Sequence, residues 1–142
     1  MSLTLEQCRT IIAAALAKGA EQGFNSLAVA VLDAGGHLKA FERQDGTSNL
    51  RPQIAHGKAF GALGMGLGSR ALFERAQQQP YFVQAVNALA GGALVPVPGG
   101  VLVKDASGAT LGAVGVTGDT SDNDEICAVV GIKAAGLLAE TG

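Results

Sequence analysis

Residues 109–127 (ATLGAVGVTGDTSDNDEIC) combine an apolar run, a glycine break and a group of acidic residues. The run at 111–116 carries no charge, which is typical of a strand covered on both faces. Gly112 and Gly115 remove side chains inside it, so we expect another backbone or a ligand to approach closely. Carboxylates then precede a helical pattern that begins near Ile126, where they complement the positive end of a helix. The segment predicts a strand, a turn and the start of a helix.

Two other parts of the chain predict strands joined by tight turns. Residues 27–32 (LAVAVL) are apolar on both alternating faces, residues 37–43 alternate, and the turn between them at 33–36 contains paired glycines. Residues 101–104 predict a strand that a turn at 105–108 connects to the apolar run described above. Because strands joined by tight turns pair antiparallel, these segments predict an antiparallel sheet covered by helices.

Helical periodicity fills most of the remaining chain. The first predicted helix begins at a capping box of Thr4 and Gln7 and ends near Gln22. Residues 91–100 contain two prolines at alternate positions, so they predict a loop or an irregular edge strand. The last predicted helix continues to about Glu140.

Between residues 50 and 90 the helical pattern comes in pieces. Ser69 is a predicted N-cap, and Pro80 is the predicted first residue of another helix. Four glycines recur at spacings of three or four residues, namely Gly57, Gly61, Gly64 and Gly68. They indicate close packing of a helix on the sheet or an early break near residues 64–66, and the alternative is room for a flat ligand or a partner helix.

The composition is that of a globular protein. The chain has 142 residues, 48% of them hydrophobic and 15% charged, which predicts one domain over residues 1–142. The low charge indicates surface buried against other subunits. The net charge of −2, without a basic cluster, argues against binding to nucleic acid.

No stretch approaches the roughly 20 apolar residues of a membrane span, so we expect no membrane association. No basic segment leads the apolar part of the first helix, which argues against a signal peptide. The two cysteines, Cys8 and Cys127, are predicted to be reduced core thiols. Together these features predict a cytoplasmic protein.

Few residues offer metal or catalytic chemistry. The chain has two histidines, His37 beside a turn and His56 in a helix, and each is a candidate to touch a ligand or metal. The acidic turn offers Asp119, Asp122 and Asp124 to a hard cation, but the spacing does not match a calcium loop. Helix capping by Ser121 or Asp122 explains most of these acids.

A composite pocket is the remaining candidate site. Backbone N–H groups at two glycine-rich turns and at the start of the last helix can bind an anion such as a carboxylate, with Arg43 and Lys58 supplying positive charge. The candidate ligand-binding residues are Arg43, His56, Lys58, Gly99, Gly100, Thr117, Gly118 and Asp119.

Four segments together resemble the GlcG/HbpS family, which includes the C-terminal domain of PduO. They are Val31–Gly46 (VLDAGGHLKAFERQDG), Ile54–Ala59 (IAHGKA), Pro98–Val101 (PGGV) and Gly112–Glu125 (GAVGVTGDTSDNDE). The resemblance covers essentially the whole chain in the same order. It implies an α/β (α+β) fold of three layers, α/β/α and profilin-like, with a five-stranded antiparallel sheet flanked by helices.

The resemblance also implies homo-oligomers, often tetramers or octamers, and a small-molecule ligand. Some members bind haem, so haem is the leading ligand candidate, with His56 as the candidate ligand to its iron. Other members are encoded with pathways for small organic acids or diols. Two alternatives therefore stay open: an enzyme or accessory protein of such a pathway, with Lys58, Arg43 or Asp119 as polar site groups, and a non-catalytic oligomeric assembly module.

Overall fold

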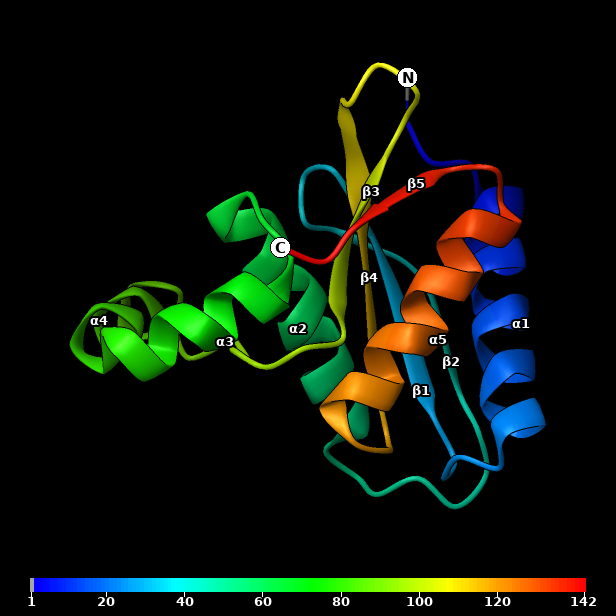
Figure 1. Ribbon diagram of the computed structural model, residues 1–142, viewed down its shortest axis with the longest axis horizontal. Helices are drawn as coiled ribbons and strands as arrows, with labels where there is room; N and C mark the ends of the chain where they lie inside the picture. Colours follow the sequence, from blue (N-terminus) through cyan, green and yellow to red (C-terminus); the bar gives the residue numbers. More distant parts are fainter. Residues whose placement is uncertain (1) are drawn as a thin grey trace.

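The computed structural model describes residues 2–142. Its helices and strands follow one another along the chain as shown in Figure 1. Their order and bounds are α1 (Leu5–Gln22), β1 (Ala28–Asp33), β2 (Leu38–Arg43), α2 (Arg51–Met65), α3 (Ser69–Gln78), α4 (Pro80–Leu89), β3 (Gly100–Lys104), β4 (Thr110–Thr117), α5 (Ser121–Ala134) and β5 (Leu138–Glu140).

The five strands form one antiparallel sheet in the order β2-β1-β4-β3-β5. The central strand is β4, the apolar run predicted from the sequence, and all its residues after Thr110 are buried. Helices α1 and α5 pack together on one face and α2 covers the other, whereas α3 and α4 project beyond the sheet (Figure 1). The predicted three-layer α/β/α arrangement with a five-stranded antiparallel sheet is confirmed.

The two sheet faces differ in the size of their side chains. Valines such as Val29 and Val114 form the core under α1 and α5. On the α2 face, Ala28 and Ala30 lie beside Ala55, while the larger Leu32 and Leu102 pack with Ala59 and Ala62 further along the helix. The small residues allow the start of α2 to lie close to the sheet.

The expected close approach at the glycines of β4 is a backbone contact. A side chain at Gly115 would overlap the carbonyl oxygen of Ala55, and one at Gly100, its cross-strand partner, would overlap the carbonyl oxygen of Lys58. The paired glycines thus form a flat platform for α2. At Gly112 the approaching groups are the carbonyl of Leu32 and the side chain of Leu3.

The prediction that the last helix continues to Glu140 is wrong. Helix α5 ends at Ala134, and Gly136 follows with a φ of 76°. A left-handed residue of this kind ends a helix, and glycine adopts it without steric strain. Residues 138–140 instead form β5, which pairs with β3 and completes that edge of the sheet. Residues 91–99 form no strand, so the loop alternative is confirmed there.

Two predicted helix caps are also wrong. The N-cap of α3 is Gly68, because the Ser69 hydroxyl accepts a hydrogen bond from the Gly100 N–H instead. The N-cap of α5 is Thr120, whose hydroxyl accepts from the Asn123 N–H, and not Ser121 or Asp122. By contrast, the capping box of α1 is present and Pro80 is the first residue of α4.

Two smaller predictions are confirmed: helix α2 breaks after Met65, at Gly66 with a φ of 74°, and the cysteines are buried and free. The expectation that the helical glycines pack on the sheet is wrong for Gly57 and Gly61, which face Val95 and Leu94 and so accommodate the loop after α4.

The search for membrane spans gives one finding: within residues 2–142, no helix is both long and apolar enough to cross a bilayer.

Candidate functional site

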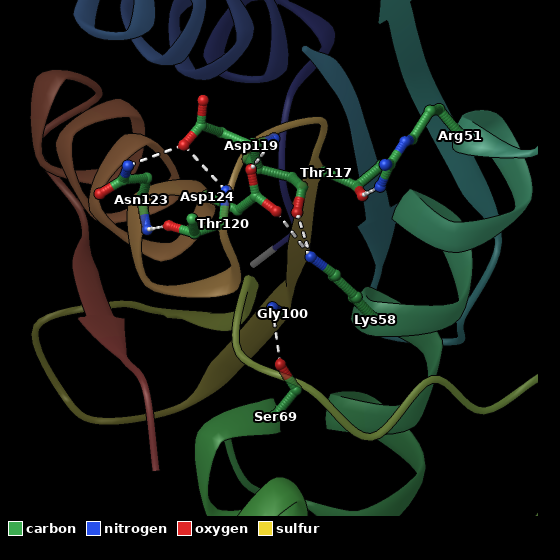
Figure 2. A network of polar contacts seen from close by, with 10 residues as sticks. Arg51, Lys58, Ser69, Gly100, Thr117, Asp119, Thr120, Asn123 and Asp124 are labelled. Carbon is green, nitrogen blue, oxygen red and sulfur yellow. Dashed lines mark hydrogen bonds and ion pairs between the residues drawn. The ribbon is translucent and has the colours of Figure 1, made fainter. Parts of the chain in front are cut away.

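A buried ion pair joins the two helix layers near the end of β4. Lys58 of α2 donates to the carboxylate Oδ2 of Asp124 in α5 and to the carbonyl oxygen of Val116, with Nζ–O distances of 2.9 Å each. Figure 2 shows this lysine pointing from α2 toward the first turn of α5. The two side chains are 2% and 1% exposed, so the pair is withdrawn from water. We call Lys58, Asp124 and the Val116 carbonyl the junction.

Burial shifts the pKa of both members of the junction toward the neutral form. It lowers the pKa of the Lys58 ammonium and raises the pKa of the Asp124 carboxyl, while their mutual attraction opposes both shifts. The second oxygen of Asp124, Oδ1, accepts from the Asp119 N–H at 2.9 Å. Throughout residues 2–142, every buried side-chain nitrogen or oxygen has a hydrogen-bond partner. The junction therefore holds no buried polar atom that awaits a ligand.

Asp119 fixes the turn between β4 and α5. Its carboxylate accepts from the N–H groups of Asn25 and Thr120 at 2.8 Å each and from the Asn123 side chain at 2.7 Å. These hydrogen bonds favour the charged form, so they lower the pKa of the Asp119 carboxyl. Its role in the structure is to tie the start of α5 to the segment before β1.

The acidic turn does not gather its carboxylates around a cation site. Asp122 pairs with Arg70 of α3, whose guanidinium also binds Glu125, while Asp119 and Asp124 have the partners described above. The two acids hold the pKa of Arg70 above its usual range. No group of three metal-binding side chains occurs in the part of the chain that the structure describes, so the cation alternative has no support.

The glycines beside the junction pack against it. A side chain at Gly99 would come within 2.9 Å of the Lys58 ammonium nitrogen, and the Gly100 N–H already donates to the Ser69 hydroxyl at 2.7 Å. These two glycines, together with Lys58, Thr117, Gly118 and Asp119, lie around the end of β4. The structure thus brings six of the eight predicted residues to one region, where Lys58, Gly99 and Gly100 are packed together and Gly118 lines a hollow.

Arg51, the first residue of α2, is a functional candidate that the sequence analysis missed. Its Nη1 donates to the hydroxyl of Thr117 at 2.7 Å, and Thr117 is fully buried (Figure 2). Pro52 follows Arg51, and a proline at this place marks the start of a helix. The sequence could therefore have placed Arg51 at the start of α2, and the structure shows that this end of the helix lies beside the end of β4.

The other two predicted residues lie apart from this region and from each other. Arg43 lines a separate hollow with Phe24 and Gln44. His56 lines an apolar groove of about 500 Å³, between β2, the start of α2 and the loop after α4. The walls of this groove, which we call the His56 groove, are formed mainly by Leu38, Leu50, Pro52, Ile54, Ala93 and Val95.

The His56 ring is held in place on the surface of α2. It stacks on Phe60, one turn further along the helix, with 5.7 Å between ring centroids and 19° between ring planes. The side chain is half-buried, and no ion pair or side-chain hydrogen bond to another residue in 2–142 engages it. An imidazole in this state offers a nitrogen to a ligand or metal.

The family model described as "Haem degrading protein HbpS-like" matches residues 3–133. No curated protein matches the sequence significantly. The sequence comparison therefore gives the family of the chain.

Solved structures share the fold over nearly the whole chain. A complex of PduOC with haem is 20% identical, with 96% of this chain and 97% of that chain covered and a TM-score of 0.86. Protein ORFY of Klebsiella pneumoniae is 22% identical, with 94% and 90% covered and a TM-score of 0.84. HbpS is 28% identical, with 94% and 89% covered and a TM-score of 0.80.

Proposed function

The chain belongs to the HbpS-like family of haem-degrading proteins, and from this premise we propose that it binds haem in the His56 groove. The observation that carries the proposal is an imidazole in the wall of an apolar groove of about 500 Å³. Pockets for organic ligands and cofactors have volumes of about 300–1,000 Å³ and mostly apolar walls with a few polar groups.

The residues of the groove fit a haem group. Its walls are aliphatic apart from Gln53 and His56, so they suit the apolar faces of a porphyrin. No charged side chain lines it, and its open side leaves room for carboxylate groups to remain in water. Haem would supply an iron that accepts an axial ligand, and His56 is the residue here that would hold it.

The organic-acid alternative finds less support in the geometry. A catalytic lysine must reach its substrate, whereas Lys58 is buried and bound to Asp124 and to the Val116 carbonyl. The carboxylate of Asp119 is likewise engaged by three donors. Neither group faces the His56 groove, so we favour ligand binding there.

We also propose that the chain forms homo-oligomers. Several large apolar side chains are exposed on the isolated chain, including Leu89 at 89%, Tyr81 at 69% and Leu50 at 67%. Exposed apolar surface of this kind is typical of subunit interfaces. Light scattering coupled to size-exclusion chromatography should give a mass that is a multiple of 14.2 kDa. A purely monomeric mass would contradict this proposal and leave haem binding untouched.

Haem binding is tested by titrating the protein with hemin and following the Soret absorption. We expect saturable binding to the wild type and a shift that is lost or at least about tenfold weaker in His56→Ala. His37→Ala is the matched control, because His37 is exposed and lies beside Asp33, outside the groove. Absence of saturation in the wild type, or equal affinity in His56→Ala, would overturn the proposal.

A second variant tests the groove independently of the imidazole. Ala93 lines the groove and is only half-buried, so Ala93→Phe fills space with little effect on the core. We expect it to weaken hemin binding while the far-ultraviolet circular dichroism stays unchanged. Full hemin affinity in this variant would place the ligand elsewhere.

A further inference from the structure

A third, polar hollow of about 350 Å³ lies beside the start of α2. Gly118 at the end of β4, Ser26 before β1 and the loop residues Thr47 and Ser48 line it together with Arg51. We call it the Arg51 hollow. In contrast to the His56 groove, its walls carry hydroxyl groups and a guanidinium, so it suits a charged ligand.

The guanidinium of Arg51 is anchored but not neutralised. One of its nitrogens donates to the Thr117 hydroxyl, and Thr117 is part of the buried end of β4. No acidic side chain in residues 2–142 forms an ion pair with it. A guanidinium has five N–H donors in a planar fork, so one anchoring bond leaves donors that match the oxygens of a carboxylate or phosphate.

The surroundings of Arg51 add positive potential to the hollow. Helix α2 begins there without a side-chain cap and without an acidic residue in its first turn. Its positive dipole end is therefore uncompensated by its own sequence. Repulsion from Arg51 also contributes to the lowered pKa of Lys58, although burial is the larger cause.

The two carboxylates of the turn after β4 that are closest to the junction are engaged by other groups. Asp119 is held by Asn25, Thr120 and Asn123, and Asp124 is held by Lys58. Both acids thus already have partners within the protein. The Thr47 hydroxyl donates to the Gln44 carbonyl at 3.2 Å, so the groups left for a ligand are the fork of Arg51 and the hydroxyls of Ser26 and Ser48.

We infer that the Arg51 hollow binds a small oxyanion, a carboxylate or a phosphate, held by the guanidinium and the hydroxyls of Ser26 and Ser48. This site is separate from the His56 groove and does not depend on haem binding. It assigns to Arg51 a specificity role: the anchored fork selects a planar or tetrahedral group of anionic oxygens over a neutral ligand.

The test is calorimetric titration with inorganic phosphate and, separately, with succinate at low ionic strength. We expect saturation by at least one of them. Saturation by phosphate alone identifies a phosphate ligand, saturation by succinate alone identifies a carboxylate, and either supports the inference. Absence of saturation by both anions up to about 10 mM would overturn it.

Variants locate the site. Arg51→Gln should weaken binding at least about tenfold, because it removes charge-assisted hydrogen bonds. Ser48→Asp places a negative charge at an exposed position in the hollow and should weaken binding without touching the Thr117 anchor. Arg9→Gln is the matched control, since it removes the same charge from an exposed position on α1 that does not line the hollow. Equal losses in Arg51→Gln and Arg9→Gln, or none in Arg51→Gln, would overturn the assignment.

Nuclear magnetic resonance gives an independent readout on the folded protein. Amide shifts on adding the anion should concentrate at Gly46, Thr47 and Gly118. His56→Ala should retain full oxyanion affinity, because His56 lines the other groove. Loss of oxyanion binding in His56→Ala, or shifts confined to the His56 groove, would contradict two separate sites.

Discussion

His56 and Lys58 lie two residues apart on α2, yet they belong to opposite kinds of environment. Residues two apart on a helix do not share a face. His56 is half-buried and looks into an apolar groove, whereas Lys58 is 2% exposed and lies in the junction with Asp124. Two polar side chains on one short helical segment thus differ: one belongs to the internal structure, and the other lies where we propose that a ligand binds.

The two regions also differ in how their polar groups are satisfied. In the junction the ammonium and the carboxylate have partners within the protein. In the groove the imidazole contacts Phe60 and is otherwise open to a ligand. Breaking the junction should therefore change stability, and changing the groove should change binding.

The largest expected effect comes from breaking the junction. Asp124→Ala leaves the Lys58 ammonium buried without its counter-charge, which should lower the free energy of unfolding by about 3–5 kcal/mol. Urea denaturation followed by circular dichroism measures this change. Wild-type stability in Asp124→Ala would show that the pair is not a structural element.

A double variant separates the cost of an unpaired charge from the worth of the pair. In Lys58→Met/Asp124→Leu both charges are gone, so much of the lost stability should return. The same urea experiment gives the comparison. A double variant as unstable as Asp124→Ala would mean that packing, and not the unpaired charge, causes the loss.

A smaller effect is expected at the platform beside the junction. Gly115→Ala forces a methyl group against the Ala55 carbonyl and should destabilise the protein by about 1–3 kcal/mol. Gly64→Ala is the control on the same helix layer, because Gly64 is exposed and helical and nothing lies near its position. It should stabilise the protein by up to about 1 kcal/mol. Equal changes in the two melting temperatures would contradict the close approach of α2.

The smallest expected effect is on the melting temperature at low pH. The pKa of Asp119 is lowered from 3.8 by hydrogen bonds in the folded protein, so its contribution to stability is present above that value. It is lost as the pH falls through the lower, folded-state pKa. Melting temperatures between about pH 5 and pH 2 should therefore fall less steeply in Asp119→Asn than in the wild type. Parallel curves would show that Asp119 does not couple folding to pH.

Local sequence patterns predicted the central strand and both hairpins, because a buried strand requires a run of apolar residues and a tight turn requires glycine or aspartate. They failed at β5, since Leu138–Glu140 is too short to show a strand pattern and forms because the edge of β3 is available. Ser69 was predicted as a cap because capping is its common local role, but a residue 31 positions away uses its hydroxyl. A prediction from neighbouring residues alone does not include a hydrogen-bond donor that the fold brings from a distant part of the chain.

The sequence pointed to the end of β4, and six of the eight predicted residues lie there, but whether they bind a ligand stays a prediction. Of the eight, His56 alone lines the groove proposed to bind haem. The sequence did not show that Lys58 is buried, because its partner Asp124 lies 66 residues away. Arg51 escaped notice because its only distinguishing contact, to Thr117, also comes from the fold.

The central claim, that the His56 groove and not the junction receives the ligand, is tested most directly by locating hemin on the folded protein. Paramagnetic iron broadens amide signals near it in a ¹H–¹⁵N spectrum. We predict that the signals of Leu38, His56 and Ala93 broaden first and those of Gly99 and Gly100 persist. Broadening that begins at Gly99 and Gly100, with Leu38 and Ala93 unaffected, would contradict the account.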